Sequence, residues 1–163
     1  MNKETPTLRP MDDAARGLAH QLLVQSRHAA LAVLQPGTGQ PTISRIGLAT
    51  TGRGQPVTLV SELSAHWPAL ANGTACALLL GEPGQRGDPL THPRLSLHGK
   101  ARVVPRDTDE EQALRRRYLR LRPNAKLYAD FADFRFVAFE VEQGLLVGGF
   151  GRAWEMTPAD MGL

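Results

Sequence analysis

Short apolar segments, separated by turn residues rather than by helices, constrain the fold of this chain most. Residues 94–104 alternate between apolar and polar side chains, as expected for a strand with one buried face. Residues 42–50 and 56–62 are two more strand-like segments, and Thr51-Gly-Arg-Gly54 between them is typical of a hairpin turn. A parallel sheet would need a helix after most strands, and that pattern is missing. The sequence therefore predicts an α+β domain built on an antiparallel barrel.

Further strand-like segments bring the expected number to six or seven: 28–34, 74–80, 134–142 and 145–150, the last two as a closing pair. Three helices are expected, at about 12–27, 64–72 and from 107 onward. Asp12 and Asp13 favour the first, because negative charge is stabilised at a helix N-terminus. Asp107 with Glu110 resembles a capping box for the third. Gly81–Pro93 is a long glycine- and proline-rich loop, and such loops usually serve a site or an interface.

Length and composition favour one domain. The chain has 163 residues, of which 42% are hydrophobic, enough for a core. Residues 1–10 are expected to form a flexible arm ahead of a domain at 11–163. No apolar run approaches the roughly 20 residues that span a bilayer, and the N-terminus lacks the apolar region of a secretory signal. We therefore expect a cytoplasmic protein that does not bind membranes.

The charge is only mildly basic. Nineteen lysines and arginines against 16 acidic residues give a net charge of +3, which is less than nucleic-acid-binding domains usually carry. Nucleic acid is therefore not expected as a partner. Five arginines cluster within residues 115–122, and a solvated helix face explains them better than an anion site, which stays an alternative. The five histidines show no metal-ligand spacing, and no metal is expected.

Five side chains form the candidate ligand site: Ser44, Arg45, Ser61, Ser64 and His66. The first two lie on the expected strand 42–50, and the other three lie at the exit of the strand 56–62. Arginine presents a forked donor that suits phosphate. The opening of the helix near Ser64 would offer free N–H groups and hydroxyl donors to the same anion.

Gly47 lies on the same strand face as Arg45, and its missing side chain would let a flat ligand approach the backbone. The residues alone leave a simpler alternative open. In that alternative Ser64 only caps its helix, while Arg45 forms an ion pair with Glu62 or Asp88.

A set of short motifs, taken in order, resembles a known family. The motifs are Ser44-Arg-Ile46, Leu59-Val-Ser61, Leu63-Ser-Ala-His66, Gly81-Glu-Pro-Gly84, Gly87-Asp-Pro-Leu-Thr-His-Pro-Arg94, Tyr128-Ala-Asp-Phe-Ala-Asp-Phe134 and Gly148-Gly-Phe-Gly-Arg152. From about residue 12 to residue 160 the chain is similar to the pyridoxamine 5′-phosphate oxidase-like, FMN-binding split-barrel superfamily, and most similar to its haem-utilisation branch.

The resemblance implies a six-stranded split barrel that forms a homodimer with FMN at the subunit interface. Arg45, Ser61, Ser64 and His66 would then surround the flavin phosphate and ribityl chain, and residues after Gly148 would reach the other subunit's site. The implied function is flavin-dependent oxidation or reduction of a small molecule.

Two other functions stay open within the same fold. One is haem binding, with a histidine such as His92 or His98 as axial ligand. The other is a split-barrel dimer that has lost its cofactor. Trp67-Pro-Ala69 favours that last alternative, because many relatives carry a lysine or arginine shortly after the histidine that matches His66.

Overall fold

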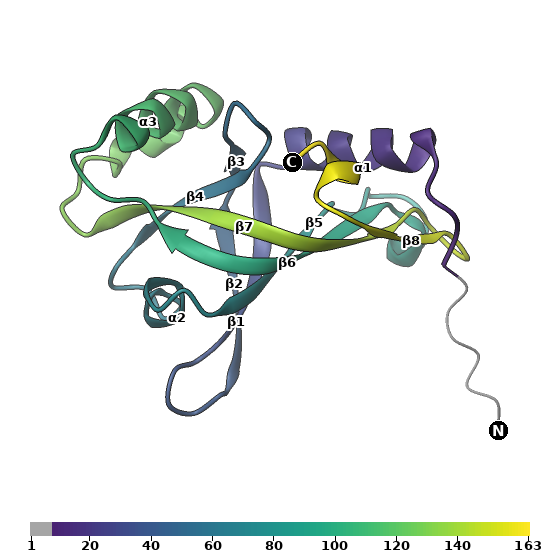
Figure 1. Ribbon diagram of the computed structural model, residues 1–163, viewed down its shortest axis with the longest axis horizontal. Helices are drawn as coiled ribbons and strands as arrows, with labels where there is room; N and C mark the ends of the chain where they lie inside the picture. The colour runs from purple at the N-terminus through teal and green to yellow at the C-terminus, as the bar shows by residue number, and fades with distance from the viewer. Residues whose placement is uncertain (1–7) are drawn as a thin grey trace.

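An eight-stranded antiparallel sheet, curled on itself, is the centre of the computed structural model, which describes residues 8–163 (Figure 1). In chain order the strands are β1 His28–Leu34, β2 Pro41–Gly47, β3 Ala49–Thr50, β4 Pro56–Ser61, β5 Ala75–Leu80, β6 Arg94–Val103, β7 Phe134–Val147 and β8 Ala153–Met156. Neighbours follow the order β2-β1-β5-β6-β7-β4-β3, and β8 pairs with β7. The expected α+β fold with an antiparallel split barrel is confirmed.

The barrel is split where β2 meets β4, and this explains why there are more strands than the six expected. The segment expected as one strand over 42–50 is interrupted at Leu48, so that β2 pairs with β1 whereas β3 pairs with β4. The chain thereby passes from one edge of the sheet to the other. The Thr58 hydroxyl donates to the Gly47 carbonyl at 2.6 Å and joins the two edges. Besides six long strands, the sheet thus contains the two-residue β3 and the four-residue β8.

The expected closing pair of strands, 134–142 and 145–150, is wrong. Residues 134–147 form the single 14-residue strand β7, which pairs with β6 from Val137 to Val147 and passes a bulge at His98/Gly99. Gly144 makes no turn, because it is paired with β6 on one side and with β8 on the other. The turn comes later, where Gly149 and Gly151 adopt positive φ angles of 120° and 66°. The true final pair is therefore β7 with β8.

Three α-helices pack on the sheet: α1 Asp13–Gln25, α2 Trp67–Ala71 and α3 Asp109–Leu121. Figure 1 shows α1 and α3 above the two ends of the long strands β6 and β7, and α2 below them. Asp12 caps α1 by accepting a hydrogen bond from the Ala15 N–H at 2.7 Å, as its charge predicted. The capping box of α3 lies one residue later than expected, because Thr108 accepts from the Glu111 N–H at 3.2 Å.

The interior is divided between two hydrophobic clusters. The larger one joins α1 and α2 to the inner side chains of β1, β5 and β6, and β5 lies between β1 and β6 as its apolar sequence predicted. The smaller cluster joins α3 to β4 and β7, and Tyr118 meets Phe136 there edge to face at 5.5 Å between ring centroids.

Part of the expected arm, residues 1–7, lies outside the described residues. At Arg9 the chain is already bound to β8, through a backbone hydrogen bond of 2.9 Å to the Ala153 carbonyl. None of the helices within residues 8–163 is both long and apolar enough to cross a bilayer.

Candidate functional site

An open cleft of about 530 Å³ lies on the outer face of β1, β2 and β5, beside the end of α1. Its floor is Ala30 of β1, which is paired with Arg45 of β2 on one side and with Leu79 of β5 on the other. Because the Ala30 side chain is small and those of Arg45 and Leu79 on either side are long, a slot is left between them. We call this hollow the Arg45 cleft.

Two arginines line the Arg45 cleft, Arg27 and Arg45. No carboxylate of residues 8–163 lies within ion-pair distance of Arg45. The two acids that the sequence offered as its partners are used elsewhere. Glu62 binds Arg135 at 2.6 Å, and Asp88 accepts a hydrogen bond from the Leu90 N–H at 2.9 Å. The Arg45 guanidinium is therefore free to bind an anion from solution.

A histidine and a glutamate form another part of the lining. His28 begins β1, and its Nδ1 atom lies 3.5 Å from Oε1 of Glu82. Glu82 directly follows Gly81, which has a φ of 100°. A Cβ atom on Gly81 would lie 2.5 Å from the Pro93 carbonyl oxygen, so a glycine is required where β5 ends. The long loop that starts at Gly81 thus contributes to the lining of the cleft.

His92 holds this loop together. Its Nδ1 atom accepts a hydrogen bond from the Gly84 N–H at 3.2 Å, and its Nε2 atom lies 2.9 Å from the Arg86 carbonyl oxygen. Both ring nitrogens are therefore engaged within the loop. This arrangement opposes the prediction of His92 as a haem ligand.

Ser61 ends β4, and Ser64 and His66 follow it in the turn before α2. The Ser61 hydroxyl donates to the Asp133 carboxylate and accepts from the Leu63 N–H at 3.0 Å. The Ser64 hydroxyl donates to the Ser61 carbonyl at 2.6 Å. Both hydroxyls thus have partners within the protein, and Asp133 adds negative charge where a phosphate was expected.

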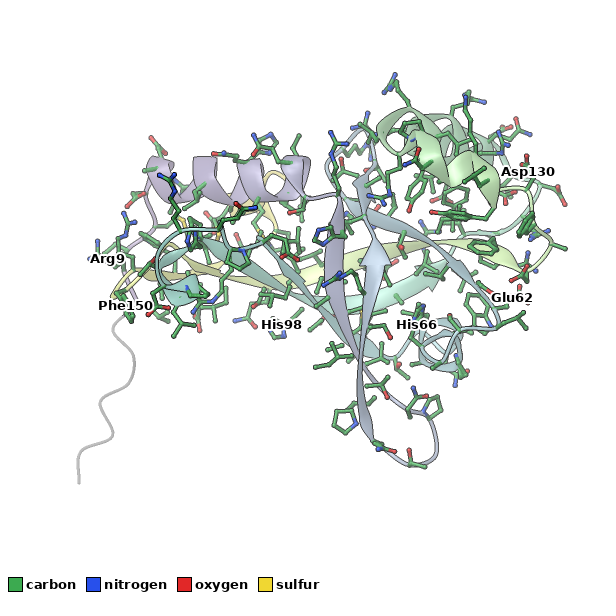
Figure 2. All side chains as sticks on the ribbon, turned by 180° about the vertical axis from the view of Figure 1, so that it is seen from behind. Arg9, Glu62, His66, His98, Asp130 and Phe150 are labelled. Carbon is green, nitrogen blue, oxygen red and sulfur yellow. The ribbon has the colours of Figure 1, made fainter. Side chains whose placement is uncertain are left out.

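His66 is buried beside α2, as Figure 2 shows. Its Nε2 atom has no hydrogen-bond partner among residues 8–163, and burial lowers the pKa of the ring, which favours the neutral form. Helix α2 has five residues and begins at Trp67, at the later end of the range 64–67 in which the sequence placed its start. The Ser64 N–H is occupied by the Ser61 carbonyl at 3.1 Å and is not free for an anion.

The five predicted site residues therefore do not form one cluster. Arg45 lines the cleft, whereas Ser61, Ser64 and His66 share the turn before α2. Ser44 lies on the opposite face of β2 from Arg45, on the side of buried Ile46, as strand alternation requires. Sequence reasoning missed the three other titratable residues of the lining, Arg27, His28 and Glu82. For Glu82 the sequence offered one indication, its place in the long loop 81–93. Arg27 and His28 offered none, because they only end an expected helix and begin an expected strand.

The interpretation of Gly47 as an opening for a flat ligand is wrong. A Cβ atom there would lie 2.8 Å from the Tyr118 hydroxyl and 3.1 Å from Nε of Arg122, so side chains of α3 and the residue after it fill this space. Arg122 also donates to the Arg27 carbonyl. Gly47 thus makes room for packing at the split of the barrel.

Three of the five clustered arginines bind other parts of the protein. Arg115 forms an ion pair of 2.5 Å with Asp130, Arg117 donates to the Thr50 carbonyl, and Arg122 donates to Arg27 as described above. Much of this basic cluster therefore binds α3 and the residue after it to other segments of the protein. The prediction of a solvated helix face did not include these contacts.

The curled antiparallel sheet, split between β2 and β4 and flanked by helices, defines a split-barrel protein. The same fold occurs in a protein of the pyridoxinephosphate oxidase family from Clostridium acetobutylicum, which is 13% identical with a TM-score of 0.67 over 93% of this chain and 99% of that one. Within this class the chain belongs to the family described as CREG, beta-barrel, whose sequence profile matches residues 10–161.

Two bacterial structures are more similar. The heme binding protein from Mycobacterium smegmatis is 28% identical, with a TM-score of 0.81 over 96% of this chain and 62% of that one. A protein of unknown function from Agrobacterium tumefaciens is 30% identical, with a TM-score of 0.80 over 96% of this chain and 64% of that one. The chain thus spans less than two thirds of the length of either protein. No curated protein matches the sequence.

Proposed function

We propose that this protein binds a planar anionic cofactor in the Arg45 cleft, and that haem is the first candidate. The observation that carries the proposal is the unpaired Arg45 beside a slot with a small apolar floor, with Arg27 nearby. Arginine binds carboxylates and phosphates through paired hydrogen bonds. The volume of about 530 Å³ lies within the range of ligand sites.

The lining residues fit haem. Arg27 and Arg45 would hold its carboxylates, while Leu22, Ala30 and Leu79 offer apolar contacts to the flat ring. The similarity to a heme binding protein at 28% identity supports this candidate. Bound haem would supply an iron centre whose reactivity depends on its axial ligand and on access from solvent.

FMN is the second candidate, and with it a flavin-dependent oxidoreductase acting on a small molecule. The superfamily fold supports it, and the forked guanidinium of Arg45 suits the flavin phosphate. Bound flavin would supply the redox chemistry, while the protein would hold the phosphate and surround the ring. Asp133 beside Ser61 and the occupied N–H of Ser64 favour the Arg45 cleft over the turn before α2 as the phosphate site.

The protein is proposed to act as a homodimer. Three large apolar side chains are exposed on the outer face of β1, β2 and β5: Leu34 at 53%, Ile43 at 76% and Leu79 at 44%. The paired residues Ala32 and Ala77 between them keep this face flat. A second copy covering it would bury the apolar side chains and close the Arg45 cleft, with which the face is continuous. Light scattering should give twice the mass of one chain, and Ile43→Lys should give monomers.

Titration of the purified protein with haemin and, separately, with FMN tests the proposed cofactor. Arg45→Ala should weaken binding by about 10- to 150-fold, because a charge-assisted hydrogen bond contributes about 1.5–3 kcal/mol. Arg116→Ala is the matched control, since Arg116 is exposed on α3 and does not line the cleft. Equal affinity of Arg45→Ala and wild type would remove Arg45 from the site.

The same titration separates the alternatives. Retention of FMN but not haemin through gel filtration would favour a flavin-dependent oxidoreductase over a haem-binding protein. Retention of neither would favour a split barrel that has lost its cofactor, with Trp67-Pro-Ala69 in place of the usual cation.

A further inference from the structure

The positions of the histidines single out one of them. All five lie in the described part of the chain, and His28 is the one that lines the Arg45 cleft. His20 lies on α1 near Gly162, and His98 lies on β6 next to Ala77, away from α1 in Figure 2. His66 is buried beside α2. Neither His92 nor His98, the two ligands that the sequence suggested, contributes to the cleft.

We infer that His28 is the axial ligand through which the Arg45 cleft binds haem iron, and that Glu82 orients its ring. This inference rests on the proposed binding of haem. His28 and Ala30 are two residues apart on β1, so both side chains project from the same outer face of the sheet. Bound haem would therefore have His28 beside it along the strand and Arg45 across the strand pair.

The ring of His28 has one nitrogen free to bind a metal. Its Nδ1 atom faces Glu82 at 3.5 Å, and its Nε2 atom has no hydrogen bond to any of residues 8–163. A carboxylate next to one ring nitrogen fixes the tautomer and makes the other nitrogen a stronger ligand. The side chain is 39% exposed, so that a ligand reaches it from solvent.

Glu82 owes its place to the backbone of Gly81. The chain leaves β5 there with a φ of 100°, which only glycine adopts at ease, and Leu22 of α1 lies 3.3 Å from where a Cβ atom would be. Two segments far apart in the sequence, the start of β1 and the end of β5, are thereby joined at one end of the cleft. Glu82 is a positioning residue, because it acts through His28.

The test is haemin binding followed by absorption and electron paramagnetic resonance spectra of the iron. His28→Ala should lower the affinity by more than about tenfold and change the spin state, and added imidazole should restore the wild-type spectrum. Glu82→Gln should lower the affinity by about tenfold while nitrogen ligation persists. Arg45→Ala should lower the affinity but keep the iron spectrum, since it removes an anion contact. His98→Ala is the control, an exposed histidine outside the cleft.

The outcomes distinguish this inference from the proposed function. Haemin binding by His28→Ala with an unchanged iron spectrum would overturn the role of His28 and leave haem binding in place. Failure of the wild-type chain to bind haemin would overturn both. Circular dichroism of each variant ensures that folded proteins are compared, and His28→Gln provides a second, less drastic replacement at this half-exposed position.

Discussion

The buried hydroxyl of Tyr118 should make this protein sensitive to alkaline pH. The side chain is 1% exposed, and its hydroxyl lies near Thr58, Leu59 and Arg122 but makes no hydrogen bond of good geometry within residues 8–163. Burial raises the pKa of Tyr118 to about 12, whereas tyrosine in an unfolded chain titrates near 10. Because the pKa is raised in the folded state, the neutral Tyr118 side chain contributes fully to the free energy of unfolding below about pH 10. This contribution is lost as the pH rises toward 12.

The size of the effect follows from this difference of about two pKa units. At pH 11 the unfolded phenol is mostly ionised and the folded one mostly neutral, so the free energy of unfolding should be about 1.4 kcal/mol lower than at neutral pH. Tyr118→Phe cannot ionise and should not show this loss. Near neutral pH the variant should be as stable as the wild type or slightly more stable, because it removes an unpaired buried hydroxyl.

Urea unfolding, followed by circular dichroism at about pH 8, 10 and 11, measures the effect. The stability difference between Tyr118→Phe and wild type should grow by about 1.4 kcal/mol from pH 8 to pH 11. Tyr128→Phe is the control, since that ring is only partly buried against Phe134. Parallel pH profiles of wild type and Tyr118→Phe would refute the argument and show that the hydroxyl is hydrated or paired in the folded protein.

Two further predictions concern packing. Gly47→Ala should lower the free energy of unfolding by about 1–3 kcal/mol, because the new methyl group would lie 2.8 Å from the Tyr118 hydroxyl. Gly17→Ala, in the middle of α1 with nothing within 4 Å, should instead raise it by about 0.5–1 kcal/mol, and a loss there comparable to that of Gly47→Ala would contradict the steric explanation. The thiol of Cys76 should react with a thiol reagent only after unfolding, because burial raises its pKa to about 11. Rapid reaction of the native protein would contradict this.

Local patterns predicted most of the secondary structure. The alternation over 94–104 became β6, and the turn Thr51-Gly-Arg-Gly54 joins β3 to β4, with a backbone hydrogen bond of 2.8 Å from Thr51 to Gln55. Asp12 caps α1 as expected. These features depend on residues that are close in the sequence, so the sequence alone reveals them. The ordered motifs correctly indicated the split barrel.

Long-range packing decided the features that the sequence missed. Gly144 falls in the gap between two expected strands, yet it is held between β6 and β8 within the single strand β7. Gly47 resembled an open position, yet Tyr118 and Arg122 fill the space beside it. In both cases the side chains and strands that settle the outcome come from distant parts of the chain, which no local pattern specifies.

The candidate site shows the same division. Arg45 could be selected from the sequence, since its residue type and its strand pointed to an anion, and the structure leaves it unpaired at a cleft. Its neighbours could not be selected, because Arg27, His28 and Glu82 meet only after β5 has been paired with β1 and Gly81 has turned the chain back toward α1. The sequence by itself determined the barrel and one arginine of its cleft. The tertiary structure decided which side chains face that arginine, since strand pairing brings together residues that are separated along the chain.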